Sequence, residues 1–346
     1  MSQRIYFHGE TGRCQILIDD SMSQLSACLA GQEIIIITDD NVNRLYSQLF
    51  PPARDVIILK PGEGTKTLLT VESIYRQLLC VSADRSTFIL GIGGGVVSDI
   101  TGFVASTFMR GLRFGFVPTT LLAQVDAAIG GKNGVNLNGF KNMIGVVNQP
   151  DFVLIDFSFL KTLPAKELAN GFSEIIKCAA IASRDLFELL EEESEQALRL
   201  DNDLLRRIVG ETVRIKTAIV SLDEKDRGQR KKLNFGHTFA HALEKAYRIT
   251  HGEAVSLGMI LAANLSVKKN MLEAAEASRI RKLLQMFGLP VSMKFDRDKI
   301  VEPIHQDKKK SGQMIDFVLL RSIGEASVER LRFSEVGEAI DDLCES

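Results

Sequence analysis

Three of the five histidines, His237, His241 and His251, fall within a stretch of fifteen residues. His237 and His241 are one turn apart on a predicted helix and share a face, and His251 starts the next predicted helix. Glu174 adds a carboxylate on the apolar side of an earlier helix, with Lys177 on the same side. Two imidazoles and a carboxylate around an open position are typical of catalytic zinc. The spacing leaves open which two histidines bind metal, and a structural role is the usual alternative for a histidine.

A glycine cluster between Gly91 and Gly95 follows a predicted strand and precedes a predicted helix. Glycine lets the backbone approach a pyrophosphate closely, and a helix N-terminus attracts negative charge. Val96 departs from the G-x-G-x-x-G fingerprint, so a tight strand-to-helix turn is the alternative. The alternation of strands and helices around the cluster favours nucleotide binding.

The segment 61–66 combines two charged side chains with two glycines. Glu63 can accept hydrogen bonds from ribose hydroxyls, and Lys66 can neutralise a phosphate. Taken alone, the segment is more typical of a capped turn with a solvated charge pair.

The segment 126–143 is basic and rich in glycine. Lys132 and Lys141 predict binding of a phosphate ester through charge-assisted hydrogen bonds. Asp126 beside these cations should stay ionised and can orient a substrate hydroxyl. We predict a long loop without regular structure over residues 130–143, which is typical of functional segments; an irregular surface loop without a function is the alternative.

Several cations lie far apart in the sequence, and spacing alone cannot bring them together. A solvated surface position is the ordinary interpretation for each of them: Arg110, Lys216, Arg230, Lys308 and Lys309.

Alternating strands and helices predict an α/β, Rossmann-like domain with a parallel sheet over residues 1–162. Strands are predicted at 34–37, 56–59, 87–91 and 112–117, and helices at 68–81 and 97–109. Residues 163–346 should form a mainly helical domain, with helices at 204–219, 237–247, 254–270, 274–287 and 334–343 and two strands at 315–320 and 326–331.

Composition limits the class of protein. The chain has 346 residues and a net charge of −2, which disfavours nucleic acid as a partner because phosphate backbones select basic surfaces. The five cysteines show no C-x-x-C spacing, as expected in a reducing cytoplasm. The N-terminus has no apolar signal segment, and the apolar runs are too short to span a bilayer. We therefore expect a cytoplasmic protein without a membrane partner.

Six segments between residues 93 and 259 resemble, in order, signature blocks of the 3-dehydroquinate synthase family, within the sugar phosphate cyclase superfamily, and the resemblance as a whole runs from about residue 31 to 312. The segments are GGGVVSDITGFVASTFMRG, VPTTLLAQVDAAIGGKNGV, GFKNMIG, LPAKELANGFSEIIKCAAI, LNFGHTFAHALE and HGEAVSLGM. Ser98 departs from the family pattern, which commonly has glycine there.

The resemblance implies NAD and Zn²⁺ as cofactors, with Co²⁺ able to replace zinc. It implies Glu174, His237 and His251 as metal ligands and places His241 on the substrate side. The implied NAD-binding positions are Asp39, Asn41, Glu63, Lys66, Gly94, Gly95, Val96, Asp99, Thr119, Thr120, Lys132, Lys141, Phe159, Leu160, Lys161 and Thr162. The implied substrate-binding positions are Asp126, Lys132, Asn142, Lys177, Lys216, Arg230, Asn234, His241 and Lys308. Arg110 matches an arginine that reaches the phosphate in a neighbouring subunit, which implies a homodimer.

The activity that the resemblance implies is that of a carbon–oxygen lyase in the shikimate pathway of aromatic amino acid biosynthesis. The substrate would be 3-deoxy-D-arabino-heptulosonate 7-phosphate, and the products 3-dehydroquinate and phosphate. The steps would be transient oxidation at C4 by NAD, phosphate elimination, re-reduction and intramolecular aldol closure. The alternatives are a sister sugar phosphate cyclase, a metal-dependent polyol dehydrogenase and a non-catalytic member of the family.

Overall fold

The computed structural model describes residues 3–29, 31–300 and 314–344. The chain divides into two compact units, one of residues 1–164 and 205–225 and the other of residues 165–204 and 226–346. The first unit thus includes most of helix α8 (Asn202–Leu222), whereas the sequence-based division placed every residue after 162 in one domain.

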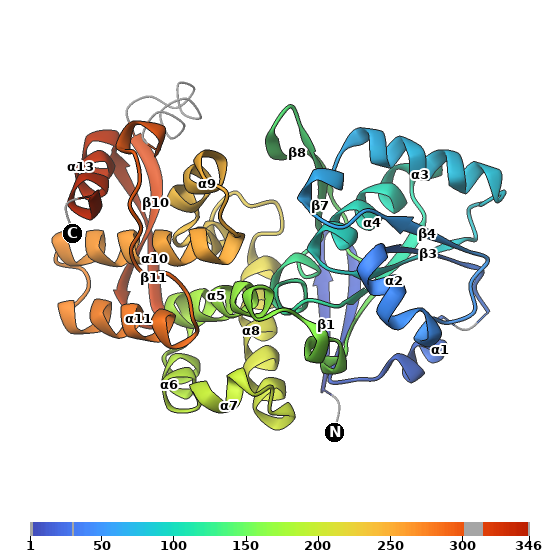
Figure 1. Cartoon of the computed structure of the whole chain (residues 1–346), viewed down its shortest axis with the longest axis horizontal. Coiled ribbons are helices and arrows are strands. Elements are labelled where there is room, and N and C mark those ends of the chain that lie inside the picture. The colour runs from blue at the N-terminus through green and yellow to red at the C-terminus, as the bar shows by residue number, and fades with distance from the viewer. Residues whose placement is uncertain (1–2, 30, 301–313, 345–346) are drawn as a thin grey trace. The chain divides into compact units, whose positions relative to one another are not determined.

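A seven-stranded sheet in the order β1-β2-β9-β6-β5-β3-β4 forms the first unit (Figure 1). Its strands are β1 (Gln3–Gly9), β2 (Gly12–Ile18), β3 (Ile34–Asp39), β4 (Asp55–Leu59), β5 (Phe88–Gly93), β6 (Arg113–Pro118) and β9 (Phe152–Ile155). β1 and β2 are antiparallel, and the other pairings are parallel. The chain leaves β3 toward β4 on one side and later continues from β5 toward β6 on the other. The strand order therefore reverses between β3 and β5, where nucleotides bind in such sheets.

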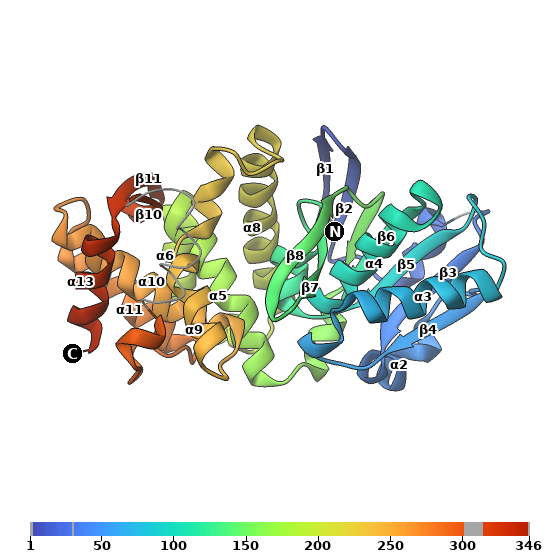
Figure 2. The ribbon, with the colours of Figure 1, turned by 90° about the horizontal axis from the view of Figure 1, so that it is seen from above.

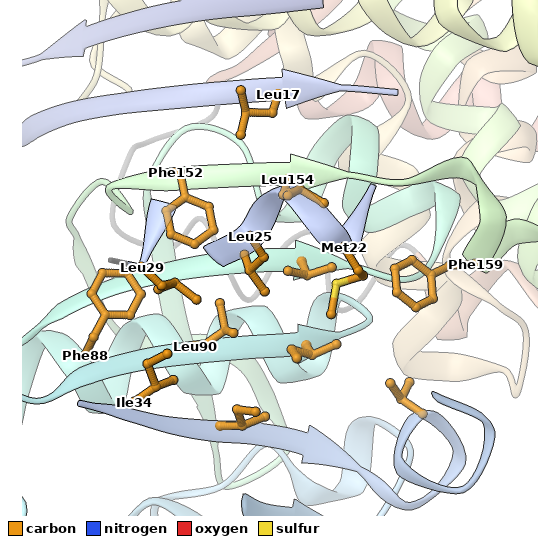
Figure 3. Packing of buried hydrophobic residues seen from close by; sticks show 14 residues of the cluster. Leu17, Met22, Leu25, Leu29, Ile34, Phe88, Leu90, Phe152, Leu154 and Phe159 are labelled. Carbon is orange, nitrogen blue, oxygen red and sulfur yellow. The ribbon is translucent and has the colours of Figure 1, made fainter. Parts of the chain in front are cut away.

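One face of this sheet carries a continuous apolar cluster, because both faces of a parallel strand are buried and select aliphatic and aromatic residues. Figure 3 shows Leu90 of β5 and Leu154 of β9 in the cluster, together with Phe159 beyond β9. The rings of Phe88 and Phe152 stack with their centroids 5.8 Å apart.

The helices of the first unit besides α8 are α1 (Leu25–Cys28), α2 (Asp40–Tyr46), α3 (Leu68–Cys80) and α4 (Gly95–Thr107). Helix α4 packs against β5 and β6 (Figure 2). This approach is close: a Cβ atom on Gly91 would lie 2.8 Å from Oγ1 of Thr101.

Residues 130–143 do not form the predicted irregular loop. They belong mostly to an antiparallel hairpin of β7 (Lys132–Leu137) and β8 (Phe140–Val147). The turn residues Asn138 and Gly139 have φ angles of 49° and 81°, as a two-residue hairpin turn requires, and Asn-Gly is its strongest sequence signal. The prediction was wrong because that dipeptide was overlooked.

The second unit is mainly helical. Its helices are α5 (Ala165–Ala182), α6 (Arg184–Glu192), α7 (Ser194–Leu198), α9 (His237–Ala246), α10 (His251–Lys268), α11 (Ala274–Met286) and α13 (Phe333–Cys344), and β10 (Met314–Ser322) pairs with β11 (Glu325–Arg332). Helix α10 contacts α5, α9, α11 and β10 (Figures 1 and 2). It is buried on nearly every side from residue 254 to residue 263, as expected of a central helix that is apolar all round.

The four strands predicted for the first half and the helices and strands predicted for the second half are confirmed, with ends shifted by a few residues. The prediction omitted β1, β2 and β9 as well as the β7–β8 hairpin. Among the described residues, no helix has the length and apolar character needed to cross a membrane.

Candidate metal and nucleotide sites

Glu174, His237 and His251 come together in the second unit, although they lie on three different helices. One ligand atom from each lies within 4.8 Å of the other two. Oε1 of Glu174 is 3.6 Å from Nε2 of His237 and 3.3 Å from Nε2 of His251. The Glu174 side chain is 1% exposed, so helix α5 presents this carboxylate to the interior.

Close packing sets the positions of the two histidines. Gly236, at φ 79°, immediately precedes α9. A Cβ atom on Gly258 of α10 would lie 2.0 Å from the carbonyl oxygen of Gly236. His251 is the first residue of α10, which Thr250 and Glu253 cap reciprocally. Asn170 of α5 accepts a hydrogen bond from the backbone N–H of Gly252 at 3.1 Å, which ties the start of α10 to the helix that carries Glu174.

The other ring nitrogen of each histidine has its own partner. Nδ1 of His237 lies 3.2 Å from the carbonyl oxygen of Phe235, and Nδ1 of His251 lies 3.3 Å from Oε1 of Glu244. Both contacts place a proton on Nδ1 and turn Nε2 toward Glu174, so Nε2 is the nitrogen of each ring that can bind a metal.

These residues fit a divalent cation. Oε1 of Glu174 is buried and has no hydrogen-bond partner within the described part of the chain, although a buried carboxylate oxygen needs one. The two imidazole nitrogens facing it are ligands that zinc accepts. A cation bound by all three atoms would satisfy the Glu174 oxygen.

The charges around the triad differ from one ligand to the next. Burial opposes the charged form of Glu174, but Lys177, which donates a hydrogen bond to Oε2, outweighs it and holds the pKa of Glu174 well below its ordinary value. Burial and the charge of Lys177 lower the pKa of His237 to about 3. Burial also opposes the charged form of His251, but contacts with Glu174 and Glu244 raise its pKa to about 10. At neutral pH, Glu174 is thus ionised and His237 neutral, the forms that bind metal, whereas His251 is protonated and must release a proton when a metal binds to Nε2.

The predicted nucleotide-binding residues lie at the carboxyl ends of the parallel strands in the first unit. Gly94 precedes α4, whose first N–H groups have no side-chain cap and can bind an anion. Thr119 donates its backbone N–H to the carbonyl oxygen of Gly93 at 3.0 Å, and Thr120 lies against Gly94. Ser98 is buried, and its hydroxyl donates to the carbonyl oxygen of Gly94 at 3.3 Å.

Lys66 is 4% exposed, so the solvated pair expected for its loop is not formed. Its ammonium group pairs with Asp99 of α4 and donates to Oδ1 of Asn142 on β8 at 2.5 Å. Burial raises the pKa of Asp99 to about 6, although Lys66 acts to lower it. In the same loop, Glu63 accepts a hydrogen bond from Asn136 of β7 at 2.8 Å. The β7–β8 hairpin is therefore joined to residues 63–66.

Lys216 and Asp126, which are ninety positions apart in the sequence, form an ion pair in the first unit. Lys216 of α8 is 6% exposed and donates also to the backbone carbonyl oxygen of Asp126 at 2.5 Å. The ordinary interpretation of Lys216 as a solvated cation is therefore wrong. In the second unit Arg230 is likewise buried, at 3% exposed.

The remaining predicted positions are spread over both units. Asp39 caps α2 by accepting from the N–H groups of Asn41 and Val42, and the side chains of Phe159 and Leu160 are buried. The hydroxyl of Thr162 contacts that of Tyr46 at 2.5 Å. The exposed positions are Asn41, Arg110, Lys132, Lys141, Lys161, Thr162, Asn234 and His241. Lys308 and Lys309 lie outside the described residues.

The sequence reasoning missed Glu244 and Asn170, which contact the start of α10. A signal for Glu244 was present, because it follows His237 by seven residues and His241 by three, on the same face of a predicted helix. The Asn170 contact depends on the packing of two helices and has no such signal.

Comparison with known proteins reveals the same fold in enzymes that bind a nicotinamide cofactor and a metal. A 2-epi-5-epi-valiolone synthase from Streptomyces hygroscopicus subsp. jinggangensis, solved with NAD⁺ and Zn²⁺, aligns with a TM-score of 0.88 and 27% identity over 96% of each chain. A 2-deoxy-scyllo-inosose synthase, solved with carbaglucose-6-phosphate, NAD⁺ and Co²⁺, aligns with a TM-score of 0.88 and 26% identity over 99% of this chain and 100% of the other. The fold is thus that of the sugar phosphate cyclases.

The family within this class follows from the sequence matches. The models of the N-terminal and C-terminal parts of 3-dehydroquinate synthase match residues 56–170 and 171–310. A 3-dehydroquinate synthase from Dehalococcoides mccartyi (strain CBDB1) is 43% identical over 322 residues, 90% of each chain. The chain belongs to the 3-dehydroquinate synthase family.

Proposed function

We propose that the chain converts 3-deoxy-D-arabino-heptulosonate 7-phosphate to 3-dehydroquinate and phosphate, with NAD and a divalent cation, normally zinc. Membership of the family supports this reaction. The observation that carries the metal dependence is the buried Oε1 of Glu174, which has no hydrogen-bond partner among the described residues and faces Nε2 of both His237 and His251. The cofactors bound in the two solved relatives support NAD with Zn²⁺ or Co²⁺.

The chemistry divides between the cofactors and the chain. When bound, NAD takes a hydride from a ring carbinol and later returns it, while zinc polarises the carbinol oxygen. The carbonyl group formed acidifies the neighbouring C–H bond. The substrate's own phosphate takes that proton, and phosphate departs with the electron pair of its C–O bond as a C=C bond forms. Ring opening and attack of the resulting enolate on the C2 ketone close the carbocycle.

The chain's residues bind and orient the reactants. Glu174, His237 and His251 hold the metal, and the turn at Gly94 and Gly95 with the start of α4 holds the pyrophosphate of NAD. Lys66, Asp99 and the other cofactor positions implied by the resemblance line the rest of the NAD site.

Three groups of residues bind the substrate. Lys132, Asn142, His241, Lys308 and the partner subunit's Arg110 hold the phosphate. Lys216 and Arg230, both buried, hold the carboxylate, as the family resemblance implies. Asp126, Lys177 and Asn234 orient the ring hydroxyls. Asp126 already pairs with Lys216, which fixes the ammonium group before a substrate carboxylate arrives.

A cytoplasmic homodimer is part of this proposal. Arg110 is exposed, and both Met109 and Arg110 have positive φ angles, 49° and 69°. Consecutive residues of this kind are strained, and such strain is concentrated at functional sites. This observation supports a specific task for Arg110, such as completing the site of a second subunit.

A phosphate-release assay with the heptulosonate substrate and NAD tests the reaction. We expect phosphate to appear without net formation of NADH, to be lost with a chelator and to return with Zn²⁺ or Co²⁺. Net NADH would indicate a polyol dehydrogenase instead. Turnover of a seven-carbon sugar phosphate lacking the carboxylate in preference to the heptulosonate would indicate a sister cyclase.

A further inference from the structure

The two histidines of the triad are held by chemically different groups. Nδ1 of His237 faces a backbone carbonyl oxygen, that of Phe235, whereas Nδ1 of His251 faces the side-chain carboxylate of Glu244 at 3.3 Å. A carbonyl group is neutral, and a carboxylate bears a full charge. The hydrogen bond that holds the His251 ring is therefore stronger than the one that holds the His237 ring.

Glu244 is placed for this contact by the helix that also carries His237. The two residues are seven positions apart on α9, so both project from one face. The Glu244 side chain is 4% exposed, whereas that of His251 is 27% exposed. A nearly buried carboxylate needs polar partners, and the His251 ring is one of them.

We propose that Glu244 is a positioning residue of the metal centre, acting on the metal only through His251. This inference rests on the proposed metal site. Glu244 fixes the His251 tautomer with the proton on Nδ1, aims Nε2 toward Glu174 and makes that nitrogen a stronger donor, as carboxylates behind metal-bound histidines do. The more exposed ligand histidine, which opens α10, thereby gains the rigidity that backbone packing gives to His237.

The test uses Glu244→Ala and the isosteric Glu244→Gln, with Zn²⁺ affinity measured by competition against a chromogenic chelator. We expect about a 10–100-fold loss of Zn²⁺ affinity in Glu244→Ala, the usual effect of removing an outer partner of a metal ligand. Glu244→Gln, which keeps an acceptor without the charge, should lose less. The d–d absorption spectrum of the Co²⁺-loaded protein should shift in both variants. If the metal-free variants melt like the wild type, unchanged Zn²⁺ affinity together with an unchanged spectrum of the Co²⁺-loaded variants would overturn the proposal.

A double-mutant cycle separates a role through His251 from a general effect. On a His251→Gln background, Glu244→Gln should have no further effect on Zn²⁺ affinity, whereas on a His237→Gln background it should keep its full effect. Equal effects on both backgrounds would contradict the proposed route. Glu276→Gln is the matched control, because this partly buried glutamate pairs with Arg184, and it should bind Zn²⁺ like the wild type.

The outcomes also distinguish this inference from the proposed function. If the wild-type protein binds no Zn²⁺ or Co²⁺, the metal-dependent function fails, whatever Glu244 does. If the wild type binds Zn²⁺ and depends on His251 but not on Glu244, only the positioning role fails.

Discussion

A buried carboxylate oxygen without a hydrogen-bond partner costs free energy, so Oε1 of Glu174 needs a reason to persist. Lys177 satisfies only the other oxygen, Oε2. Two imidazole nitrogens, Nε2 of His237 and Nε2 of His251, lie within 3.6 Å of the same oxygen. A cation bound to Oε1 would remove this free-energy cost. It would also explain why α5 carries a carboxylate on its buried side.

Replacement of a triad histidine should remove the metal without disturbing the other unit. We expect His251→Ala to abolish tight Zn²⁺ binding and phosphate release while leaving NAD affinity unchanged, because the predicted NAD residues lie in the first unit. Metal content after dialysis measures the first effect, and calorimetric titration with NAD measures the second. His241→Ala is the control, since this exposed histidine should not be needed for zinc. Retention of zinc by His251→Ala would refute the ligand assignment.

At the scale of elements, the metal site depends on how closely α9 can approach α10. A Cβ atom on Gly258 would lie 2.0 Å from the carbonyl oxygen of Gly236, and backbone cannot yield as a flexible side chain can. Gly258→Ala should therefore push the start of α9 away, lower the stability by about 1–3 kcal/mol and weaken Zn²⁺ binding.

Gly337→Ala is the control for this substitution. Gly337 lies in α13, where the added Cβ atom would meet only Arg297 at an ordinary 3.7 Å. It should be neutral or stabilise the helix by about 1 kcal/mol. Chemical denaturation measures the stability, and chelator competition measures the Zn²⁺ affinity. A Gly258→Ala variant as stable as Gly337→Ala would contradict the packing argument.

Helix α8 delivers Lys216 to Asp126, and its C-terminal end is fastened by Glu224. This carboxylate, 4% exposed, accepts from the backbone of Glu10 at 2.5 Å, the hydroxyl of Thr11 at 2.6 Å and the amide of Gln149 at 2.7 Å. Burial opposes its charged form, but these hydrogen bonds lower its pKa below the ordinary 4.5.

A carboxylate with a lowered pKa stabilises the folded state above its ordinary pKa, and this contribution is lost as the pH falls through the lowered value. We therefore expect Glu224→Gln to melt below the wild type at pH 7, with the difference shrinking at pH values under the ordinary glutamate pKa. Thermal denaturation across that range measures the effect. Glu10→Gln, which removes only an exposed pair with Lys225, should change the melting temperature little. A difference between Glu224→Gln and the wild type that stayed constant at all pH values would contradict the titration of Glu224.

Periodicity and turn residues predicted the parallel strands, the long helices and the change of character near residue 163, because these depend on local burial. The Asn138-Gly139 turn was also local and could have been found. Strand β1, in which only one residue is buried, carries a weak hydrophobic pattern, and the prediction omitted it. The partners of Lys66 and Lys216 could not be predicted from spacing, since ion pairs across 33 and 90 residues are determined by packing. The metal triad was predictable only in part. Its residue types were visible in the sequence, but the choice of two ligands among three histidines needed the fold or a family resemblance.

At the scale of the whole molecule, the proposed dimer predicts that two inactive variants can repair each other. Arg110→Ala removes a phosphate contact supplied to the neighbouring subunit, whereas Lys216→Ala removes a contact within the subunit's own site. In a mixed dimer, the site of the Arg110→Ala subunit keeps its own Lys216 and receives the partner's Arg110, so it is complete. Random mixing in a two-fold dimer should then restore about a quarter of the wild-type phosphate release.

The measurement is phosphate release after co-expression of the two variants, with the mass of the assembly determined by light scattering. Arg113→Ala, which alters an exposed arginine paired with Asp151 on the same unit, should be active alone and serves as the control. A monomeric wild type, or dimers that exchange subunits without regaining activity, would show that Arg110 does not act across a subunit boundary. Recovery near a quarter requires an arginine supplied in trans, because a contact within one subunit leaves both sites of the mixed dimer defective.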